Sequence, residues 1–188
     1  MPKSSEPPPL CPITSALPVQ TTSSHPARET GTSDSERSAT AQAIYEKEPD
    51  AVKATPDLLR KNLFGETPYA HALLAFSSGS ADAPGEGEAV GLALYFFNYS
   101  TWTGKPGLYL EDLYVKQDQR SNGVGKALFR ELGQVAENKG CARMDWVVLT
   151  WNQPSIDFYE KRLGATRMSD WMGMRLDEKG IADLKNLV

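Results

Sequence analysis

The chain has 188 residues, a net charge of −4 and 40% hydrophobic residues, which fits one globular domain with an extension. The acidic balance argues against a nucleic-acid partner, which would select a basic face, and no apolar run is long enough to cross a membrane. The two cysteines, Cys11 and Cys141, lie in unrelated settings and favour a reducing compartment over a disulfide, so we expect a cytoplasmic protein.

The first part of the chain differs in composition from the rest. Residues 1–38 are rich in Pro, Ser and Thr and hold too little apolar surface to offset the entropy lost on ordering. We therefore predict a disordered extension over 1–38 and a folded domain over 39–188. Two short helices follow, one ending before Pro49 and one over 56–64, where Thr55 is the predicted N-cap and Gly65 the stop signal.

Three strands are predicted in the centre of the chain. The segments "YAHALLAF" (69–76), "AVGLALYFFNYS" (89–100) and "LYLEDLYV" (108–115) are apolar or alternating. A Gly-rich loop over 77–88 and a turn over 101–107 separate them. Sequential strands joined by short connections form one sheet.

The last third alternates helices and strands. Helices are predicted over 123–139 and 153–163, strands over 143–151 and 171–177, and a short helix at the C-terminus. A helical crossover between strands indicates an α/β fold with a mixed central β-sheet flanked by helices.

The spacing Arg120-x-x-Gly123-x-Gly125 comes directly after a predicted strand and opens a predicted helix. Bare backbone at a helix N-terminus lets an anion approach the N–H groups, and the helix dipole favours a phosphate or pyrophosphate there. The glycines could instead serve only a tight turn. A nucleotide P-loop is excluded, because Ala127 stands where the metal-binding Ser or Thr is required.

Four segments in combination resemble the Gcn5-related N-acetyltransferase (GNAT) superfamily, and most of all its diamine (spermidine/spermine) acetyltransferase branch. They are "STWTGK", "YLEDLYV", "RSNGVG" and "WNQPSIDFYEKRLGA", within a match that runs from about Ala39 to the C-terminus. The resemblance implies the GNAT fold, acetyl-CoA as co-substrate and a homodimer. We expect no metal, because no group of His, Cys, Asp and Glu has ligand spacing.

By this resemblance, acetyl-CoA is held by the glycine loop, a strand edge and the start of a helix. The cofactor-binding residues so implied are Leu113, Tyr114, Val115, Arg120, Ser121, Asn122, Gly123, Val124, Gly125, Lys126, Asn152 and Ser155. Asn152 could also be a plain helix cap, and the two roles are compatible.

Acetyl transfer to an alkyl amine needs a proton acceptor for the amine, whose pKa in water is about 10, and a proton donor for the departing thiolate. The resemblance implies that Glu111 helps to take the amine proton and that Tyr159 protonates the sulfur. Glu111 could instead be a surface carboxylate, and Tyr159 a core residue. Strand alternation places Glu111 and Asp112 on opposite faces of the sheet.

The same resemblance places five residues at the amine end of the site: Tyr45, Glu46, Trp102, Glu111 and Asp145. Carboxylates and aromatic faces suit a cation, although Trp102 could simply cover a turn.

Two departures from the family affect the interpretation. No first strand is legible before Tyr45, so that strand is either lost, which would expose a sheet edge, or altered by a changed N-terminus. Polyamine enzymes carry a late acidic residue near the substrate, and here Trp171 and Met172 occupy that place. This favours a smaller amine, such as a lysine-like amino acid, as a serious alternative to a polyamine.

We therefore expect an enzyme that transfers acetyl from acetyl-CoA to a primary amine of a polyamine, a diamine or a lysine-like amino acid. An acetyltransferase acting on proteins or peptides, and a non-catalytic acyl-CoA-binding domain, remain as alternatives.

Overall fold

The computed structural model describes residues 19–21, 53–77 and 88–187. The chain separates into two compact units, Met1–Val147 and Val148–Val188. The helix expected before Pro49 lies outside the described residues, as do the candidate substrate residues Tyr45 and Glu46.

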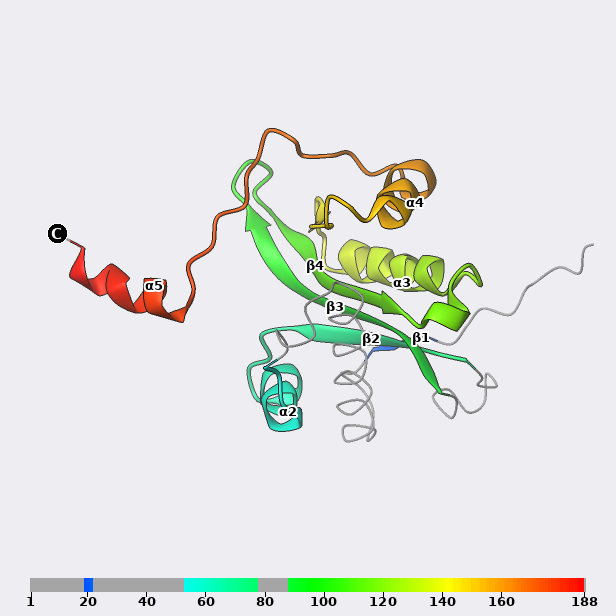
Figure 1. Cartoon of the computed structure of the whole chain (residues 1–188), viewed down its shortest axis with the longest axis horizontal. Coiled ribbons are helices and arrows are strands. Elements are labelled where there is room, and N and C mark those ends of the chain that lie inside the picture. The colour runs from blue at the N-terminus through cyan, green and yellow to red at the C-terminus, as the bar shows by residue number, and fades with distance from the viewer. Residues whose placement is uncertain (1–18, 22–52, 78–87, 188) are drawn as a thin grey trace, which may run out of the picture. The chain divides into compact units, whose positions relative to one another are not determined.

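The first unit is built around a five-stranded sheet in the order β1-β2-β3-β4-β5 (Figure 1). Its strands are β1 (Val19–Thr21), β2 (His71–Phe76), β3 (Ala89–Ser100), β4 (Lys105–Val115) and β5 (Met144–Trp146). The pairs from β1 to β4 are antiparallel, and β4 and β5 run parallel. The mixed sheet predicted from the sequence is confirmed.

Strand β1 was not predicted from the sequence. Val19–Thr21 pairs with Leu73–Ala75 of β2, inside the segment for which we expected no regular structure and before the point where no first strand was legible. Three residues are too short to show an alternation of their own. Their strand conformation depends on the edge that β2 offers, which lies about 50 residues further along the chain.

Two helices accompany the sheet in this unit. Helix α2 (Pro56–Phe64) begins at the predicted cap, where Thr55 Oγ1 accepts a hydrogen bond from the Leu58 N–H at 3.3 Å. Helix α3 (Val124–Asn138) lies along one face of the sheet and contacts β3 and β4 (Figure 1). A Cβ at Gly91 of β3 would stand 2.8 Å from Val124 Cγ1, so the glycine lets the helix approach the strand closely.

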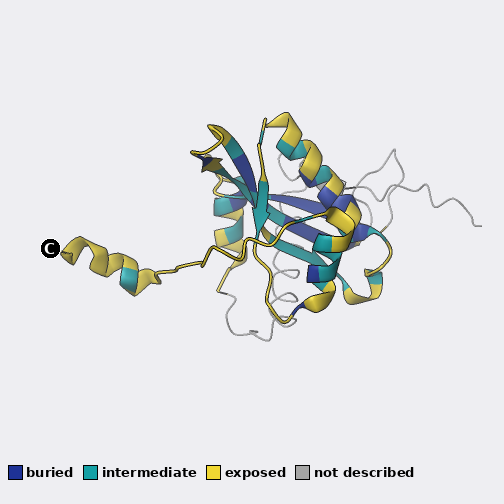
Figure 2. Ribbon diagram, turned by 90° about the horizontal axis from the view of Figure 1, so that it is seen from above, coloured by how far each residue is buried: buried dark blue, intermediate teal, exposed yellow. Residues whose placement is uncertain are grey.

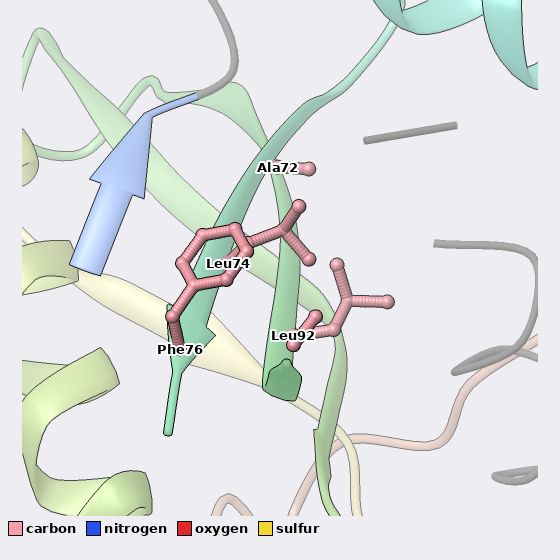
Figure 3. Packing of buried hydrophobic residues seen from close by; sticks show 5 residues of the cluster. Ala72, Leu74, Phe76 and Leu92 are labelled. Carbon is pink, nitrogen blue, oxygen red and sulfur yellow. The ribbon is translucent and has the colours of Figure 1, made fainter. Parts of the chain in front are cut away.

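The core of the unit covers both faces of β2 and β3. The central strands are buried (Figure 2), and one cluster joins the two strands side chain to side chain (Figure 3): Ala72, Leu74, Phe76, Ala89 and Leu92, with Leu94 and Tyr114 packed against it. β2 is buried along almost its whole length. This explains why its sequence is a continuous apolar run and not an alternation.

The second unit holds helix α4 (Gln153–Leu163), helix α5 (Glu178–Asp183) and a 3-10 turn over Leu184–Asn186. Another 3-10 turn, Gln117–Gln119, lies before α3 in the first unit. Helix α4 and the terminal helix are confirmed. The strand predicted over 171–177 is wrong: these residues form no ladder with any described strand.

The exposure of this segment gives the physical reason. Met172 and Met174 are 85% and 88% exposed, so the apolar alternation that suggested a strand is not buried against anything described. β5 is also shorter than the predicted 143–151. Among the described residues, no helix has both the length and the apolar character needed to cross a membrane.

Candidate active site

Strand β4 carries a bulge at Glu111. Leu110 pairs with Tyr95 and Asp112 pairs with Leu94, so Glu111 is the extra residue between two consecutive partners on β3. Leu110 and Asp112 therefore point to opposite faces, and strict alternation does not continue through Glu111. The expectation that Glu111 and Asp112 occupy opposite faces relied on that alternation, which the bulge interrupts. Glu111 is exposed, and a bulge is a common way to re-aim a side chain.

Beyond the bulge, β4 still pairs with β3 but no longer pairs with β5. Leu113, Tyr114 and Val115 pair with Ala93, Leu92 and Gly91 of β3. On the other side, pairing between β4 and β5 stops at Leu110 and Trp146. No described strand pairs with that edge of β4 from Glu111 onwards, so the two strands part at the bulge.

The chain leaves this strand through a strongly turned loop. Arg120 Nε donates a hydrogen bond to the Val115 carbonyl at 3.1 Å, which fastens the loop to the end of β4. Ser121 and Gly123 both have positive φ, 68° and 86°. A non-glycine residue is uncommon in that region, and Gly123 adopts it without strain.

Gly123 is also the N-cap of α3 and has no side chain with which to cap it. A Cβ there would meet no atom within 4 Å, so the position borders open space. By helix geometry the first N–H groups of α3 have no intrahelical acceptor, and no acidic residue stands in its first turn. The exposed Lys126 adds positive charge. These residues fit a diphosphate group.

Besides Glu111, two described candidates for the amine end are Trp102 and Asp145. Trp102 is in the turn and 86% exposed. Asp145 lies on β5 opposite Tyr109 of β4 and forms an ion pair with Arg143, with 2.8 Å between Arg143 Nε and the carboxylate. Its charge is therefore already compensated by a neighbour, whereas the exposed Glu111 forms no ion pair with any residue that the structure describes.

Sequence reasoning missed Arg143 as a candidate for the site. The guanidinium also lies 3.5 Å from the Oγ of Ser100, which is buried. A signal was present: Arg143 precedes Asp145 by two residues in a predicted strand, and residues at that spacing share a face.

The second unit carries the remaining candidates on α4. Asn152 Oδ1 accepts a hydrogen bond from the Ser155 N–H at 3.4 Å, so the predicted cap is confirmed. Tyr159 is half-buried in the middle of the helix, with its ring centroid 5.6 Å from that of Phe158. Hydrogen bonds from Lys161 and Gln153 lower the pKa of Asp157 in the same helix.

The sheet, the bulged strand and the glycine turn into α3 define a GNAT-type acetyltransferase fold. The sequence pattern of the Acetyltransferase (GNAT) family matches residues 40–165. The chain belongs to this family. It is an acetyl-CoA-dependent N-acetyltransferase, and the predicted family and fold class are confirmed.

Two relatives support the predicted branch of the family. A thialysine N-epsilon-acetyltransferase of Bos taurus is 40% identical over 148 residues, covering 76% of this chain and 84% of the relative. A spermidine/spermine N(1)-acetyltransferase-like protein of Homo sapiens is 35% identical over 145 residues, covering 76% of this chain and 20% of the relative. The resemblance to the diamine acetyltransferase branch is therefore confirmed.

Solved structures agree on the fold. An integron cassette protein from the mobile metagenome of V. cholerae superposes with a TM-score of 0.67 over 91% of this chain and 99% of the other, at 21% identity.

Proposed function

We propose that the protein acetylates a primary amine of a diamine, a polyamine or a lysine-like amino acid at the bulge of β4. One observation carries this proposal. The exposed carboxylate of Glu111 stands where β4 parts from β5, on the same strand that leads into the glycine loop. A proton acceptor and an anion site are thereby attached to one rigid strand, as acetyl transfer requires.

The donor end is formed by the loop and the strand edge. The backbone N–H groups from Asn122 to Lys126 bind the pyrophosphate of acetyl-CoA, and Arg120 holds the loop against Val115. The backbone of Leu113 to Val115 meets the pantetheine arm along the edge that no described strand occupies. Asn152 and Ser155, which form the cap of α4, remain proposed pantetheine-binding residues of the second unit.

The proton transfers are divided between two side chains. Acetyl-CoA supplies the activated acetyl group, and its thiolate is the leaving group. Glu111 receives the amine proton, directly or through one water, so that the neutral nitrogen can attack. Tyr159 donates its phenolic proton to the sulfur.

The class of acceptor is supported by the relatives. One is a thialysine acetyltransferase and another is spermidine/spermine acetyltransferase-like, and both names denote small aliphatic amines. Exposed Trp102 offers an aromatic face to a cation, and Tyr45 and Glu46 remain proposed amine-binding residues. We further propose a cytoplasmic homodimer. Scattering by the full chain at tens of micromolar tests the assembly, and a monomer would contradict that part of the proposal.

A thiol-release assay with acetyl-CoA tests the function. The amines to compare are L-lysine, L-thialysine, cadaverine, spermidine and a peptide with a free N-terminus. We expect turnover with at least one of the small amines and little with the peptide. Turnover confined to the peptide would favour a protein acetyltransferase. No turnover with any amine, together with measurable acetyl-CoA binding, would favour a non-catalytic domain.

A further inference from the structure

Gly107 of β4 lies beneath two polar side chains from neighbouring strands. A Cβ at this position would stand 2.2 Å from Asn98 Oδ1, 3.2 Å from Arg143 Cγ and 3.4 Å from Arg143 Nε. Any larger residue would collide with the Asn98 amide oxygen and crowd the Arg143 side chain. The glycine therefore makes the space in which the Arg143 side chain crosses β4 beside Asn98.

Arg143 is fixed by two contacts that do not occupy all of its hydrogen-bond donors. Its Nε donates to Asp145 at 2.8 Å, and its Nη1 lies at the long limit of a hydrogen bond, 3.5 Å, from Ser100 Oγ. A guanidinium carries five N–H donors, so these two contacts leave capacity for a further acceptor. The side chains of Arg143 and Asp145 are 45% and 37% exposed, and a ligand can reach both.

The side chain of Asn98 offers the Arg143 guanidinium a second hydrogen-bond acceptor. Its Oδ1 is buried and accepts no hydrogen bond from any residue that the structure describes. This oxygen and Arg143 Nε both lie within 3.4 Å of the point where a Cβ of residue 107 would stand. A displacement of Arg143 that brings a guanidinium N–H to this oxygen would satisfy the acceptor, so such a displacement has a compensating gain.

The Arg143–Asp145 pair lies beside β4 on the face of the sheet that carries Tyr109, towards the bulge at Glu111. Asp145 pairs with Tyr109, whose ring stacks on Phe96 at 5.0 Å between centroids. Tyr109 and Asp112 pair with Phe96 and Leu94, which share a face of β3, and Glu111 stands in the bulge directly before Asp112. From Gly107 to Glu111 the strand spans about 13 Å, a distance that an extended lysine-sized molecule and the long Arg143 side chain can bridge together.

The order of charges matches an α-amino acid. Such a molecule carries an ammonium and a carboxylate side by side, which complement Asp145 and Arg143, while its distal amine lies towards Glu111. A polyamine has only ammonium groups and would meet the like charge of Arg143, which acts against it. We propose that Arg143 is a specificity-determining residue that binds the α-carboxylate of a lysine-like acceptor. This inference rests on the proposed function of the same site.

The experiment compares two acceptors that differ only by a carboxylate, L-thialysine and bis(2-aminoethyl) sulfide, with the full-length protein. We expect the wild type to have the higher kcat/KM for thialysine. In Arg143→Gln, the ratio of the two kcat/KM values should fall about tenfold or more, the scale of a lost charge-assisted hydrogen bond. Arg143→Lys should fall between the two, because it keeps the charge but loses the fork that pairs with a carboxylate.

Arg130→Gln is the matched control. Arg130 is an exposed arginine of α3 that pairs with the adjacent Glu131, and its loss should leave the ratio unchanged. A purely structural Arg143 would lower both kcat/KM values by the same factor, and that result would overturn the inference while leaving the proposed function intact. A wild type that prefers the sulfide diamine would also overturn it. Absence of turnover with either acceptor would contradict both proposals.

Discussion

The two units of the chain differ in how their apolar residues are used. In the first unit, Leu73, Leu92, Leu108, Leu128 and Leu132 are all 0% exposed. In the second, Ile156 is the buried apolar residue of α4. The segment after that helix exposes most of its large apolar side chains: Met168, Trp171, Met172, Met174, Leu176, Ile181, Leu184 and Leu187. The first unit has a core of its own, whereas the second has little core.

This difference separates the proposed chemistry into two parts. Glu111, the glycine loop and Arg143 are carried by the sheet and by the helix packed on it, so their relative positions are set by a close-packed core. Tyr159 is carried by a short helix with a good cap at each end but few buried neighbours within its unit. Substitutions should therefore have different consequences in the two units.

The largest contrast should appear in stability. Leu128→Ala in α3 should cost about 2–5 kcal/mol of unfolding free energy, because it leaves a cavity beneath a helix that spans the sheet. Met174→Ala, at a residue 88% exposed, should change it by less than about 0.5 kcal/mol. Urea titrations of both variants measure this. Equal losses would mean that Met174 is buried in solution and that the two units do not differ in this way.

The next largest effect concerns Tyr159. Tyr159→Phe keeps the ring and its packing but removes the proton, so turnover should fall about a hundredfold if the hydroxyl is the acid. Acetyl-CoA affinity and melting temperature should hardly change. Tyr69→Phe, at an exposed tyrosine of the first unit, is the control and should retain normal turnover. Near-normal turnover of Tyr159→Phe with a lowered melting temperature would instead assign this residue to packing.

A smaller effect is expected at the donor end. Gly123→Asp places a side chain at a position of positive φ and a negative charge beside the proposed pyrophosphate site, and it should weaken acetyl-CoA binding more than tenfold by calorimetry. Gly133→Asp adds the same side chain to the exposed middle of the same helix, where a Cβ would meet nothing within 4 Å. It should bind acetyl-CoA normally. Equal affinities for the two variants would exclude the loop from the donor site.

Much of the fold followed from local signals. The caps at Thr55 and Asn152 and the glycine before α3 fix helix ends through contacts within three or four residues, and such contacts are legible in a sequence. Strand β3 was predicted at its observed bounds, Ala89–Ser100, because its apolar run ends at a turn.

The features that were not predicted depend on partners far along the chain. The bulge at Glu111 is a matter of register against Leu94 and Tyr95, and no property of β4 alone reveals it. β1 exists because β2 offers an edge. The Arg143–Asp145 pair needed only the alternation of a short strand, but its position over Gly107 required the β3–β4 pairing.

The smallest effect should be seen in the pH dependence of stability, where the two units should respond in different ranges. In the first unit, burial and the nearby charge of Lys139 lower the pKa of His71 below its ordinary 6.5. In the second, hydrogen bonds from Lys161 and Arg167 lower the pKa values of Asp157 and Glu160 below their ordinary 3.8 and 4.5.

All three groups have a lower pKa in the folded protein than in the unfolded chain, so the unfolded chain takes up the proton first as the pH falls. Each contribution to stability is therefore full above the ordinary pKa and is lost as the pH falls through the pKa of the folded protein. Acidification from pH 7 to 5 should therefore lower the melting temperature through His71, whose ring packs against Tyr95 at 5.3 Å between centroids. His71→Phe keeps an aromatic ring there without a titrating nitrogen, and its melting temperature should be flatter over that range. Asp157→Asn should match the wild type between pH 7 and 5 and differ only below about pH 4.5. An equal slope for the wild type and His71→Phe from pH 7 to 5 would show that the core of the first unit does not resist protonation of His71.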